Sequence, residues 1–294
     1  MKTRLFAFAA LGIALTACTN DNEVTDNGPV AAVINAEISD AVATRASGTA
    51  WADKDEIGVS ENRYGYTNVP YRRANGKFEP AGSIIFFEDD ASTTFSAYYP
   101  YDSNGGTLTA TTDATAQQNQ PDIDFLYATG ATASTHNPEV NFTDGTKAGG
   151  KDCSFHHCMS QITLTFVAGS GVDFSTIQPE SYTLSELVLT GSFDTTTGIA
   201  KTDDGAQAAN LDMPIGSQLT SSVILFPQTK ASIGLTVVFN GYDYNATLTV
   251  PDGELKAGNN YTYTVTVRNQ DLSIGSAEIT DWNPVIGGGV NAEL

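Results

Sequence analysis

The residues whose types could most readily bind a metal or react lie between positions 153 and 158, where the sequence reads Cys-Ser-Phe-His-His-Cys. Thiols and imidazoles are zinc ligands, but structural zinc sites usually take two ligands from one tight turn and two from a distant segment. The only other histidine is His136, so no second pair is available. Neighbouring side chains of a strand also point to opposite faces, so the four groups would not converge on one ion. We therefore expect no metal site and no cofactor.

Two other reactions of this cluster are also disfavoured. A nucleophilic Cys158 would need the imidazole of His157 beside its thiol, yet adjacent strand residues face opposite ways. A disulfide between Cys153 and Cys158 is conceivable in an exported protein, but a straight strand would hold their Cα atoms too far apart. We interpret both cysteines as chance or packing residues.

Carboxylates are abundant, with 34 Asp and Glu side chains in the chain. A pair of them could serve a glycosidase-like hydrolase, which stays open as an alternative, although solvated surface charge is the simpler interpretation. Asp203-Asp204-Gly205 and Asp252-Gly253 could hold calcium, but neither continues into an EF-hand loop, so we expect turns. The sequence also lacks a nucleophile elbow, a His-Glu-x-x-His motif and a phosphate-binding glycine loop. It predicts a protein that is not an enzyme.

Tyrosines could provide a platform on which sugar rings stack. The candidates are Tyr64, Tyr66, Tyr71, Tyr98, Tyr99, Tyr101, Tyr242 and Tyr244. Tyrosine is also a good strand residue, and packing is the interpretation we favour. A surface lipoprotein that binds glycans and does not polymerise remains the alternative function.

The elements that would position these side chains are short strands. From Trp51 onward the strand-forming residues Thr, Val, Tyr, Phe and Ile dominate, and the turn-forming residues Gly, Asn and Asp separate their runs. Strands are predicted over residues 93–100, 160–167, 185–190, 223–226, 235–239, 246–250 and 261–267. Asn75-Gly76 and Asn240-Gly241 predict hairpin turns, because both residue types tolerate positive φ. Many short strands at this spacing predict an all-β protein built from antiparallel β-sandwiches.

The N-terminus predicts export. Lys2 and Arg4 precede an apolar run over residues 5–15, and small residues stand just before Cys18. The run is shorter than the roughly 20 residues of a membrane-spanning helix. Leu-Thr-Ala-Cys at positions 15–18 resembles the bacterial lipobox, which implies fatty acyl chains such as palmitate on Cys18. We therefore expect a lipoprotein signal peptide over residues 1–17 and attachment to the cell outer membrane through the lipid.

Charge and length limit the partners and the number of domains. The formal net charge is −20, and loss of Lys2 and Arg4 with the signal would take it to about −22. Such acidity argues against nucleic-acid binding, which needs a basic surface. The length suits two domains of ordinary size. We predict a tether and removable leader over 18–45, an N-terminal β-sandwich domain over 46–170 and a C-terminal one over 171–294, with the boundary near residues 168–171.

A set of short motifs in fixed order resembles one family. The motifs lie at residues 43–46 (Ala-Thr-Arg-Ala), 51–59 (resembling W…GD.IGV), 96–101 (AYYPY), 124–128 (DFMYA), 157–162 (HKMSKI), 256–261 (AGK.Y) and 279–282 (I.DW). Cys158, Gln161 and Asn259 stand where the family has lysine. Together the motifs resemble the fimbrillins, the type V pilins and related lipoproteins of Bacteroidales.

The resemblance implies a transthyretin-like fold in both domains and assembly by strand exchange. In such pilins a trypsin-like, arginine-specific protease cuts near the start of the mature protein, and Arg45 maps onto that position, with Ala46 as the new first residue. Residues 31–38 would then be the removable strand, since they are apolar and compatible with β-structure. A donor strand from another fimbrial subunit would fill the vacated groove. The implied role is a stalk or tip subunit of a fimbria that supports adhesion to a host or bacterial surface ligand.

The C-terminal segment leaves the type of subunit open. Residues 284–294 are long enough to donate a strand. The triplet Gly287-Gly288-Gly289, however, weakens strand propensity. The segment is interpreted either as a donor strand with a flexible hinge or as a simple tail, and stalk, tip and anchor roles all remain open.

Overall fold

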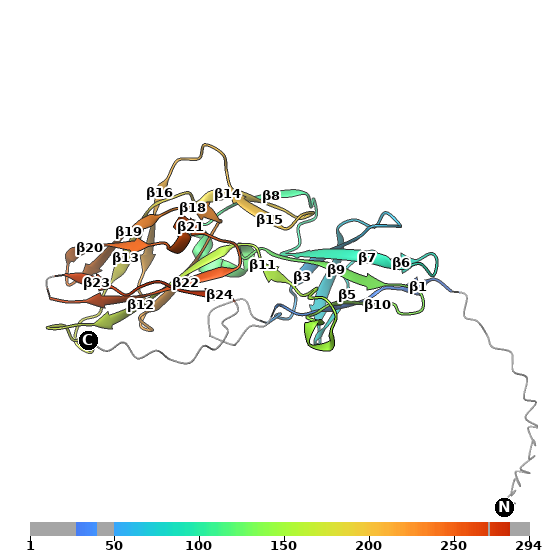
Figure 1. The fold of residues 1–294 in the computed structure, drawn as a ribbon, viewed down its shortest axis with the longest axis horizontal. Coiled ribbons are helices and arrows are strands. Elements are labelled where there is room, and N and C mark those ends of the chain that lie inside the picture. Colours follow the sequence, from blue (N-terminus) through green and yellow to red (C-terminus); the bar gives the residue numbers. More distant parts are fainter. Residues whose placement is uncertain (1–27, 40–49, 270, 283–294) are drawn as a thin grey trace, which may run out of the picture.

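Strands make up almost all of the regular secondary structure in the described residues, which confirms the predicted fold class. The computed structural model describes residues 28–39, 50–269 and 271–282, arranged as two lobes along the long axis (Figure 1). Besides strands it contains three short 3-10 turns, η1 (Ala116–Asp122), η2 (Thr146–Ala148) and η3 (Pro251–Gly253). Within those described ranges, no helix has the length and apolar character needed to cross a membrane.

The first lobe contains one large sheet and a small two-stranded one. Its strands are β1 (Val30–Ala31), β2 (Val33–Ala36), β3 (Glu56–Glu61), β4 (Val69–Ala74), β5 (Lys77–Pro80), β6 (Phe86–Phe87), β7 (Thr93–Tyr99), β9 (Leu126–Ala133), β10 (Glu139–Phe142) and β11 (His156–His157). The large sheet has the order β10-β2-β5-β4-β3-β7-β9-β11, and β1 pairs with β6. The lobe closes around its own apolar core, which includes Ile34, Ile57 and Phe155.

The second lobe packs two sheets face to face. Its strands are β12 (Ser160–Ala168), β13 (Ser181–Leu187), β16 (Ala209–Pro214), β17 (Thr220–Leu225), β18 (Gln228–Thr229), β19 (Ser232–Phe239), β20 (Tyr242–Thr249), β21 (Glu254–Leu255), β22 (Asn259–Val267), β23 (Leu272–Ile274) and β24 (Glu278–Asp281). One sheet has the order β17-β12-β22-β23, with β24 also on β22, and the other is β16-β13-β19-β20. Their inner faces share a second core.

Strand alternation and turn chemistry explain these elements. In β12, Ile162, Leu164 and Phe166 are buried on one face, as their period of two predicts. The Asn240-Gly241 turn joins β19 to β20 with φ angles of 54° and 74°, which confirms the predicted hairpin. Asn75-Gly76 joins β4 to β5 in the same way, with φ angles of 51° and 83°.

The strand predicted over residues 185–190 is wrong. The chain instead ends β13 at Leu187 and starts β14 (Thr190–Asp194) three residues later. Two features separate them. Glu186 has a φ of 62°, which leaves the β region. The side chain of Gln228 hydrogen-bonds both the N–H and the C=O of Val188, at 3.0 and 3.2 Å, so this peptide needs no strand partner.

Among the strands of the described residues, two pairs are parallel and the other pairs are antiparallel. β2 runs parallel to β10, and β12 runs parallel to β22. The second pair lies close in sequence to the predicted boundary between the two domains, near residues 168–171. That boundary stays a prediction. β12 precedes that point in the chain, yet its buried side chains lie in the second core.

A small sheet bridges the lobes. β8 (Thr107–Thr111) pairs with β14, which pairs with β15 (Ile199–Thr202). A third apolar cluster lies at the junction, where the rings of Phe125 and Phe193 stack with centroids 4.7 Å apart. The buried Gln117 amide of η1 bonds the backbone N–H and C=O of Ile224 in β17. These contacts fasten the two lobes to each other.

Candidate functional site

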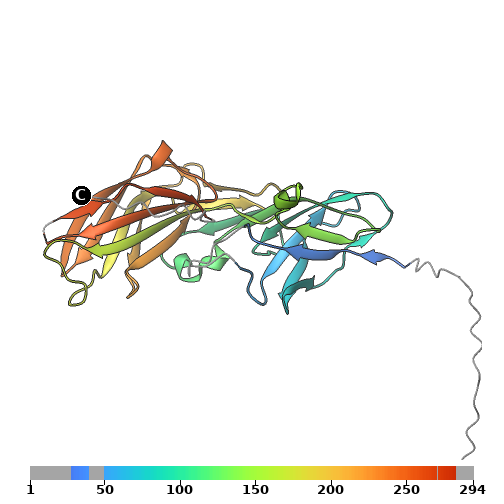
Figure 2. The ribbon, with the colours of Figure 1, turned by 60° about the horizontal axis from the view of Figure 1, so that its bottom comes forward.

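The segment that the sequence marks as removable forms part of the first lobe. We call residues 30–39 the leader strand. It enters as β1 beside β6, continues as β2 between β10 and β5, and ends where Ile38 bridges to Phe155. Figure 2 shows this blue segment lying along the face of the first lobe. The predicted strand over residues 31–38 therefore lies within the observed one.

Main-chain hydrogen bonds hold the leader strand along most of its length. The Ala32 N–H donates to the Ile85 carbonyl and the Val33 N–H donates to the Pro138 carbonyl, each at 2.9 Å. Farther along, the Glu37 N–H donates to the Phe142 carbonyl, also at 2.9 Å. At the end of the strand, the Phe155 N–H donates to the Glu37 carbonyl at 2.9 Å, and the Ser39 N–H donates to the Phe155 carbonyl at 2.8 Å. The strand is thus part of the ladder, because its peptide groups satisfy those of its neighbours.

Alternate side chains of the leader strand enter the core. Ala32 and Ile34 are 5% and 2% exposed, whereas Val33 between them is 49% exposed. Val30, Ala36 and Ile38 pack against the same core from partly buried positions. Burial of the Ile34 side chain alone is worth about 1.5–3 kcal/mol. Withdrawal of the strand would therefore open an apolar groove in the first lobe.

Two side chains from other segments hold the leader strand by polar contacts. The Trp51 indole Nε1–H donates to the Ala36 carbonyl at 3.0 Å. The Asn35 side-chain amide donates to the Asn141 side-chain oxygen on β10 at 2.8 Å. The Trp51 ring meets Phe78, Tyr99 and Phe155 edge to face, with centroids 5.0–5.5 Å apart. These contacts fix both the position of Trp51 and the register of β2.

The two sides of the leader strand are held differently. On the β10 side the parallel pairing covers Val33–Ala36, whereas on the β5 side only Ile34 is paired, with Phe78. A hollow of about 260 Å³ lies beside β2 on that second side, lined by residues that include Lys77 and Thr143. The leader strand is therefore more open to solvent along β5 than along β10.

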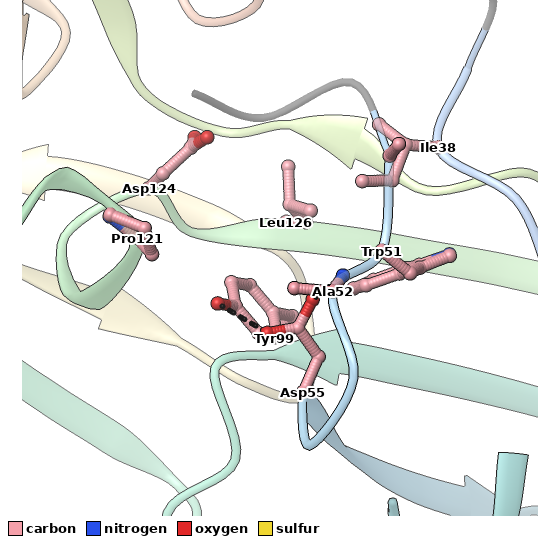
Figure 3. Close-up of a pocket in the computed structure, with 9 residues that line it drawn as sticks. Ile38, Trp51, Ala52, Asp55, Tyr99, Pro121, Asp124 and Leu126 are labelled. Carbon is pink, nitrogen blue, oxygen red and sulfur yellow. Dashed lines mark hydrogen bonds between the residues drawn. The ribbon is translucent and has the colours of Figure 1, made fainter. Parts of the chain in front are cut away.

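A second cavity, of about 240 Å³, lies at the end of the leader strand (Figure 3). Ile38, Trp51 and Leu126 supply apolar walls, and the carboxyl groups of Asp55 and Asp124 lie at its border. Asp55 accepts hydrogen bonds from the Ala52 N–H at 2.7 Å and from the Tyr99 hydroxyl at 3.4 Å. Burial raises the pKa of the Asp55 carboxyl, and these hydrogen bonds oppose the rise.

The second carboxyl group of this cavity belongs to a buried pair. His157 Nδ1 lies 2.7 Å from Asp124 Oδ1, and their side chains are 1% and 4% exposed. The imidazole stacks on the Trp282 indole, with centroids 4.3 Å apart and planes within 2°. Asp55 and Asp124 are thus each engaged by their own partners.

Cys153 and Cys158 are free, buried residues. Burial raises the pKa of the Cys158 thiol, and the neighbouring Asp124 carboxylate raises it further. Burial likewise raises the pKa of the Cys153 thiol. A reactive cysteine needs a lowered pKa, so the packing interpretation is the one this geometry favours. Within the described residues, no group of three or more His, Cys, Asp or Glu side chains could hold a metal ion.

The candidate tyrosines are spread over both lobes. Tyr71 and Tyr98 are buried in the first lobe and its junction, whereas Tyr242 is 68% exposed on β20 of the second lobe. Tyr64 packs against the first core and donates a hydrogen bond to Asp89 at 2.9 Å. No single face gathers the set, so these positions do not favour a sugar-stacking platform.

The three predicted processing residues, Cys18, Arg45 and Ala46, lie outside the described residues. The segments on either side of Arg45 are described, however. The leader strand ends at residue 39, and Trp51, which holds it, follows six residues after Arg45. The predicted cut thus falls between the leader strand and the residue that binds its carbonyl.

Three residues of the site were not anticipated from the sequence. Asn141 and Phe155 contact the leader strand although they lie more than 100 positions later in the sequence. No local sequence pattern predicts such a parallel pairing. Trp51 belongs to the motif at residues 51–59, which could have marked it as important. Its role as a hydrogen-bond donor to the leader strand follows only from the fold.

Comparison with known families gives one match, over residues 44–282, to a family described as fimbrillin-like. The match covers both lobes but starts after the leader strand. No curated protein matches the chain.

Two solved structures of similar fold come from Bacteroides species. The crystal structure of a candidate cell adhesion protein from Bacteroides ovatus ATCC 8483 is 29% identical, with a TM-score of 0.68 over 88% of this chain and 98% of that chain. A candidate cell adhesion protein from Bacteroides uniformis ATCC 8492 shares the fold at 22% identity, with the same TM-score over 86% of this chain and 99% of that one.

Proposed function

This chain belongs to the fimbrillin-like family, and from that premise we propose that it is a structural, non-enzymatic subunit of a cell-surface fimbria. The similarity to a candidate cell adhesion protein supports a role in adhesion. The subunit is a stalk or tip component that assembles with other fimbrial subunits. The observation that carries the proposal is the leader strand, which completes the first lobe although it lies wholly before Arg45.

Export and anchoring come first in this proposal. The signal peptide over residues 1–17 directs the chain out of the cytoplasm, and the lipid on Cys18 holds the precursor at the outer membrane. The lipid is a means of delivery, because a cut after Arg45 separates it from both lobes. The N-terminal motif at residues 15–18 supports this step.

Processing is the second step. An arginine-specific protease cuts after Arg45, leaving Ala46 as the first residue. The leader strand then remains in the first lobe only through noncovalent contacts, namely its ladder hydrogen bonds, the burial of Ala32 and Ile34, and the bond from Trp51. Each backbone hydrogen bond contributes a net ~1 kcal/mol, so the strand can leave when a competitor replaces those contacts.

Strand exchange is the third step. Departure of the leader strand exposes unpaired peptide groups on β10 and an apolar groove, both of which are unfavourable in water. A strand from a second subunit satisfies both at once. The exposed peptide groups and the apolar groove together supply the driving force for assembly.

The test is assembly from purified precursor. We expect an arginine-specific protease to produce filaments visible by electron microscopy, and N-terminal sequencing to find Ala46. The matched control is Arg45→Ala, which should stay monomeric under the same treatment. Filaments that form equally well from the Arg45→Ala protein would contradict processing at this position, and a cut protein that never polymerises would contradict the fimbrial role.

A further inference from the structure

The strand β8 leaves one of its two edges without a partner. It lies at the end of the bridging sheet, where β14 is its only strand neighbour among the described residues. Figure 1 shows β8 at the upper margin of the junction between the lobes. We propose that the free edge of β8 pairs with β8 of a second copy of this chain, antiparallel and centred on Thr109. This inference goes beyond the proposed function, because strand exchange in the first lobe leaves the β8 edge unused.

The ladder between β8 and β14 shows which peptide groups of β8 point outward. Just beyond one end of β8, the Thr112 N–H donates to the Leu189 carbonyl at 2.7 Å. Just beyond the other end, the Thr195 N–H donates to the Gly106 carbonyl at 2.9 Å. In an antiparallel ladder the peptide groups of alternate residues point to the same side. The even-numbered residues of β8 therefore bond β14, and the peptide groups of the odd-numbered residues point to the free edge.

These outward peptide groups form a self-complementary set. They belong to Thr107, Thr109 and Thr111, which are spaced evenly about the central residue. When two β8 strands pair antiparallel about that centre, Thr109 lies opposite Thr109 of the second copy, and Thr107 lies opposite Thr111. In all three pairs the N–H and C=O groups of the two copies then face each other, and each pair exchanges two hydrogen bonds. The register therefore satisfies every outward peptide group of both strands.

The side chains of β8 suit the same register on both faces of the sheet. Thr109 is exposed on the outer face, whereas Leu108 and Ala110 pack from partly buried positions against the cluster at the junction. The two-fold pairing places threonine opposite threonine on the outer face, an arrangement that stabilises antiparallel sheets. On the inner face it places Leu108 opposite Ala110 of the second copy. The two bridging sheets would thus join into one continuous sheet with a two-fold axis at Thr109.

β8 lacks the features that protect other edge strands of this protein. Charged side chains and proline on an edge discourage the approach of another strand. Among the strands that end a sheet, β15 carries Lys201, β20 carries Asp243, and β16 carries Asp212 and Pro214. β8 reads Thr-Leu-Thr-Ala-Thr and contains neither a charge nor a proline. Its edge is therefore open to pairing.

β17 shows how this chain protects an edge that is also uncharged. It reads Thr-Ser-Ser-Val-Ile-Leu and ends its own sheet. The Gln117 side-chain amide bonds both the N–H and the C=O of Ile224, at 3.0 and 2.7 Å. The Gln120 side-chain amide donates to the Ser222 carbonyl at 2.7 Å. Side chains of η1 thus occupy the peptide groups of the β17 edge, and within the described part of the chain β8 has no such cap.

Charge and symmetry identify the partner as a second copy. Two chains that each carry a net charge of −20 repel each other, so they approach most easily where neither surface strand is charged. The contact spans five residues on each side, which is too few to bury the roughly 1,000 Å² of a stable complex. It is therefore weak between two free subunits. It becomes effective where many copies lie side by side, as on neighbouring fimbriae, because their contacts add.

A single cysteine tests the register. In a chain that carries Cys18→Ser, Thr109→Cys should give a covalent dimer on mild oxidation, because hydrogen-bonded partners in an antiparallel pair have Cα atoms about 5.5 Å apart. The matched control is Thr107→Cys, whose two copies would be offset by about 14 Å along the strands. We expect its yield to be lower by at least about tenfold. Cys153 and Cys158 are buried, so the Cys18→Ser protein alone should give no product. A yield from Thr107→Cys that equals or exceeds that from Thr109→Cys would overturn the register.

A charge on the edge tests the contact without a cross-link. Thr109→Lys places two ammonium groups opposite each other at the two-fold axis, and it should weaken dimerisation about fivefold or more in sedimentation equilibrium. The matched control is Thr247→Lys, which adds the same charge at an exposed position of β20 and should not weaken dimerisation. Both positions are exposed, and circular dichroism should show that both variants keep the fold. Equal weakening by the two substitutions would place the contact away from β8.

The salt dependence provides a third measurement. A contact through uncharged strands should strengthen with added salt, because salt screens the repulsion between two acidic copies, whereas a contact made by ion pairs would weaken. All three measurements use the uncut Arg45→Ala protein, so their outcome does not depend on the assembly of fimbriae. A protein that stays monomeric at high concentration and high salt, and gives no covalent dimer from Thr109→Cys, overturns the inference and leaves the fimbrial role intact. Dimerisation that weakens with salt overturns it as well.

Discussion

The two lobes contain the same element, a parallel strand pair, but use it differently. In the second lobe β12 pairs with β22 over eight positions and with β17 on its other side over six. In the first lobe β2 pairs with β10 over four positions and with β5 at a single one. β12 is central and permanent, whereas β2 is short, open on one side and separated from the rest of its lobe by the predicted cut. The comparison teaches that a short strand can bury its inward-facing side chains while one of its backbone edges stays mostly unpaired.

The largest effect should follow removal of the leader strand. After cleavage and displacement, we expect opening of the first lobe to become easier by about 5 kcal/mol, from the lost side-chain burial and backbone bonds. Amide hydrogen exchange should then accelerate on the order of a thousandfold in β10 and at Phe155, while β13 and β19 of the second lobe keep their protection. Equal losses in both lobes would contradict a role of the leader strand that is confined to the first lobe. Protease-treated Arg45→Ala protein is the control.

A smaller effect should separate two core substitutions. Leu164→Ala in β12 should lower the free energy of unfolding by about 4 kcal/mol, because this side chain is fully buried between two sheets. Ile34→Ala in β2 should cost about 2 kcal/mol, since the hollow beside it lets the site relax. Urea denaturation of the uncut protein measures both. A cost for Ile34→Ala that equals that of Leu164→Ala would show that the leader strand is as firmly built in as β12.

The smallest effect should come from a single hydrogen bond. Trp51→Phe keeps an aromatic ring but removes the N–H that donates to Ala36, a loss of about 1 kcal/mol. The cut leader strand should then dissociate about fivefold faster, as measured by mass spectrometry of the released peptide. The matched control is Trp282→Phe, which changes the chain's other tryptophan, whose ring stacks on His157. Equal rates in the two variants would remove Trp51 from the binding of the leader strand.

Much of the fold could be predicted because it is locally encoded. The alternation of Ile162, Leu164 and Phe166 gives β12 its buried face, and Asn240-Gly241 gives β19 and β20 their turn. The break between β13 and β14 could not be predicted in this way. There the decisive partner is the Gln228 side chain, 40 residues away, and the intervening sequence remains apolar and β-compatible.

The candidate site divides in the same manner. The apolar pattern of the leader strand could be read directly, because burial and strand geometry leave a local signature. Its neighbours could not, since a parallel pairing with β10 joins residues more than 100 positions apart. The positions of Arg45 and Ala46 are predicted from a family motif alone, and biochemical processing is the way to test them.

The bridging sheet has a mechanical consequence. β8 comes from the chain between the first-lobe strands and is hydrogen-bonded to β14 over five positions, next to the stacked rings of Phe125 and Phe193. A subunit braced in this way resists bending at its middle. In a filament of such subunits, flexibility would concentrate at the joints where one copy enters the next. The number of subunits would then set how far the filament yields under flow.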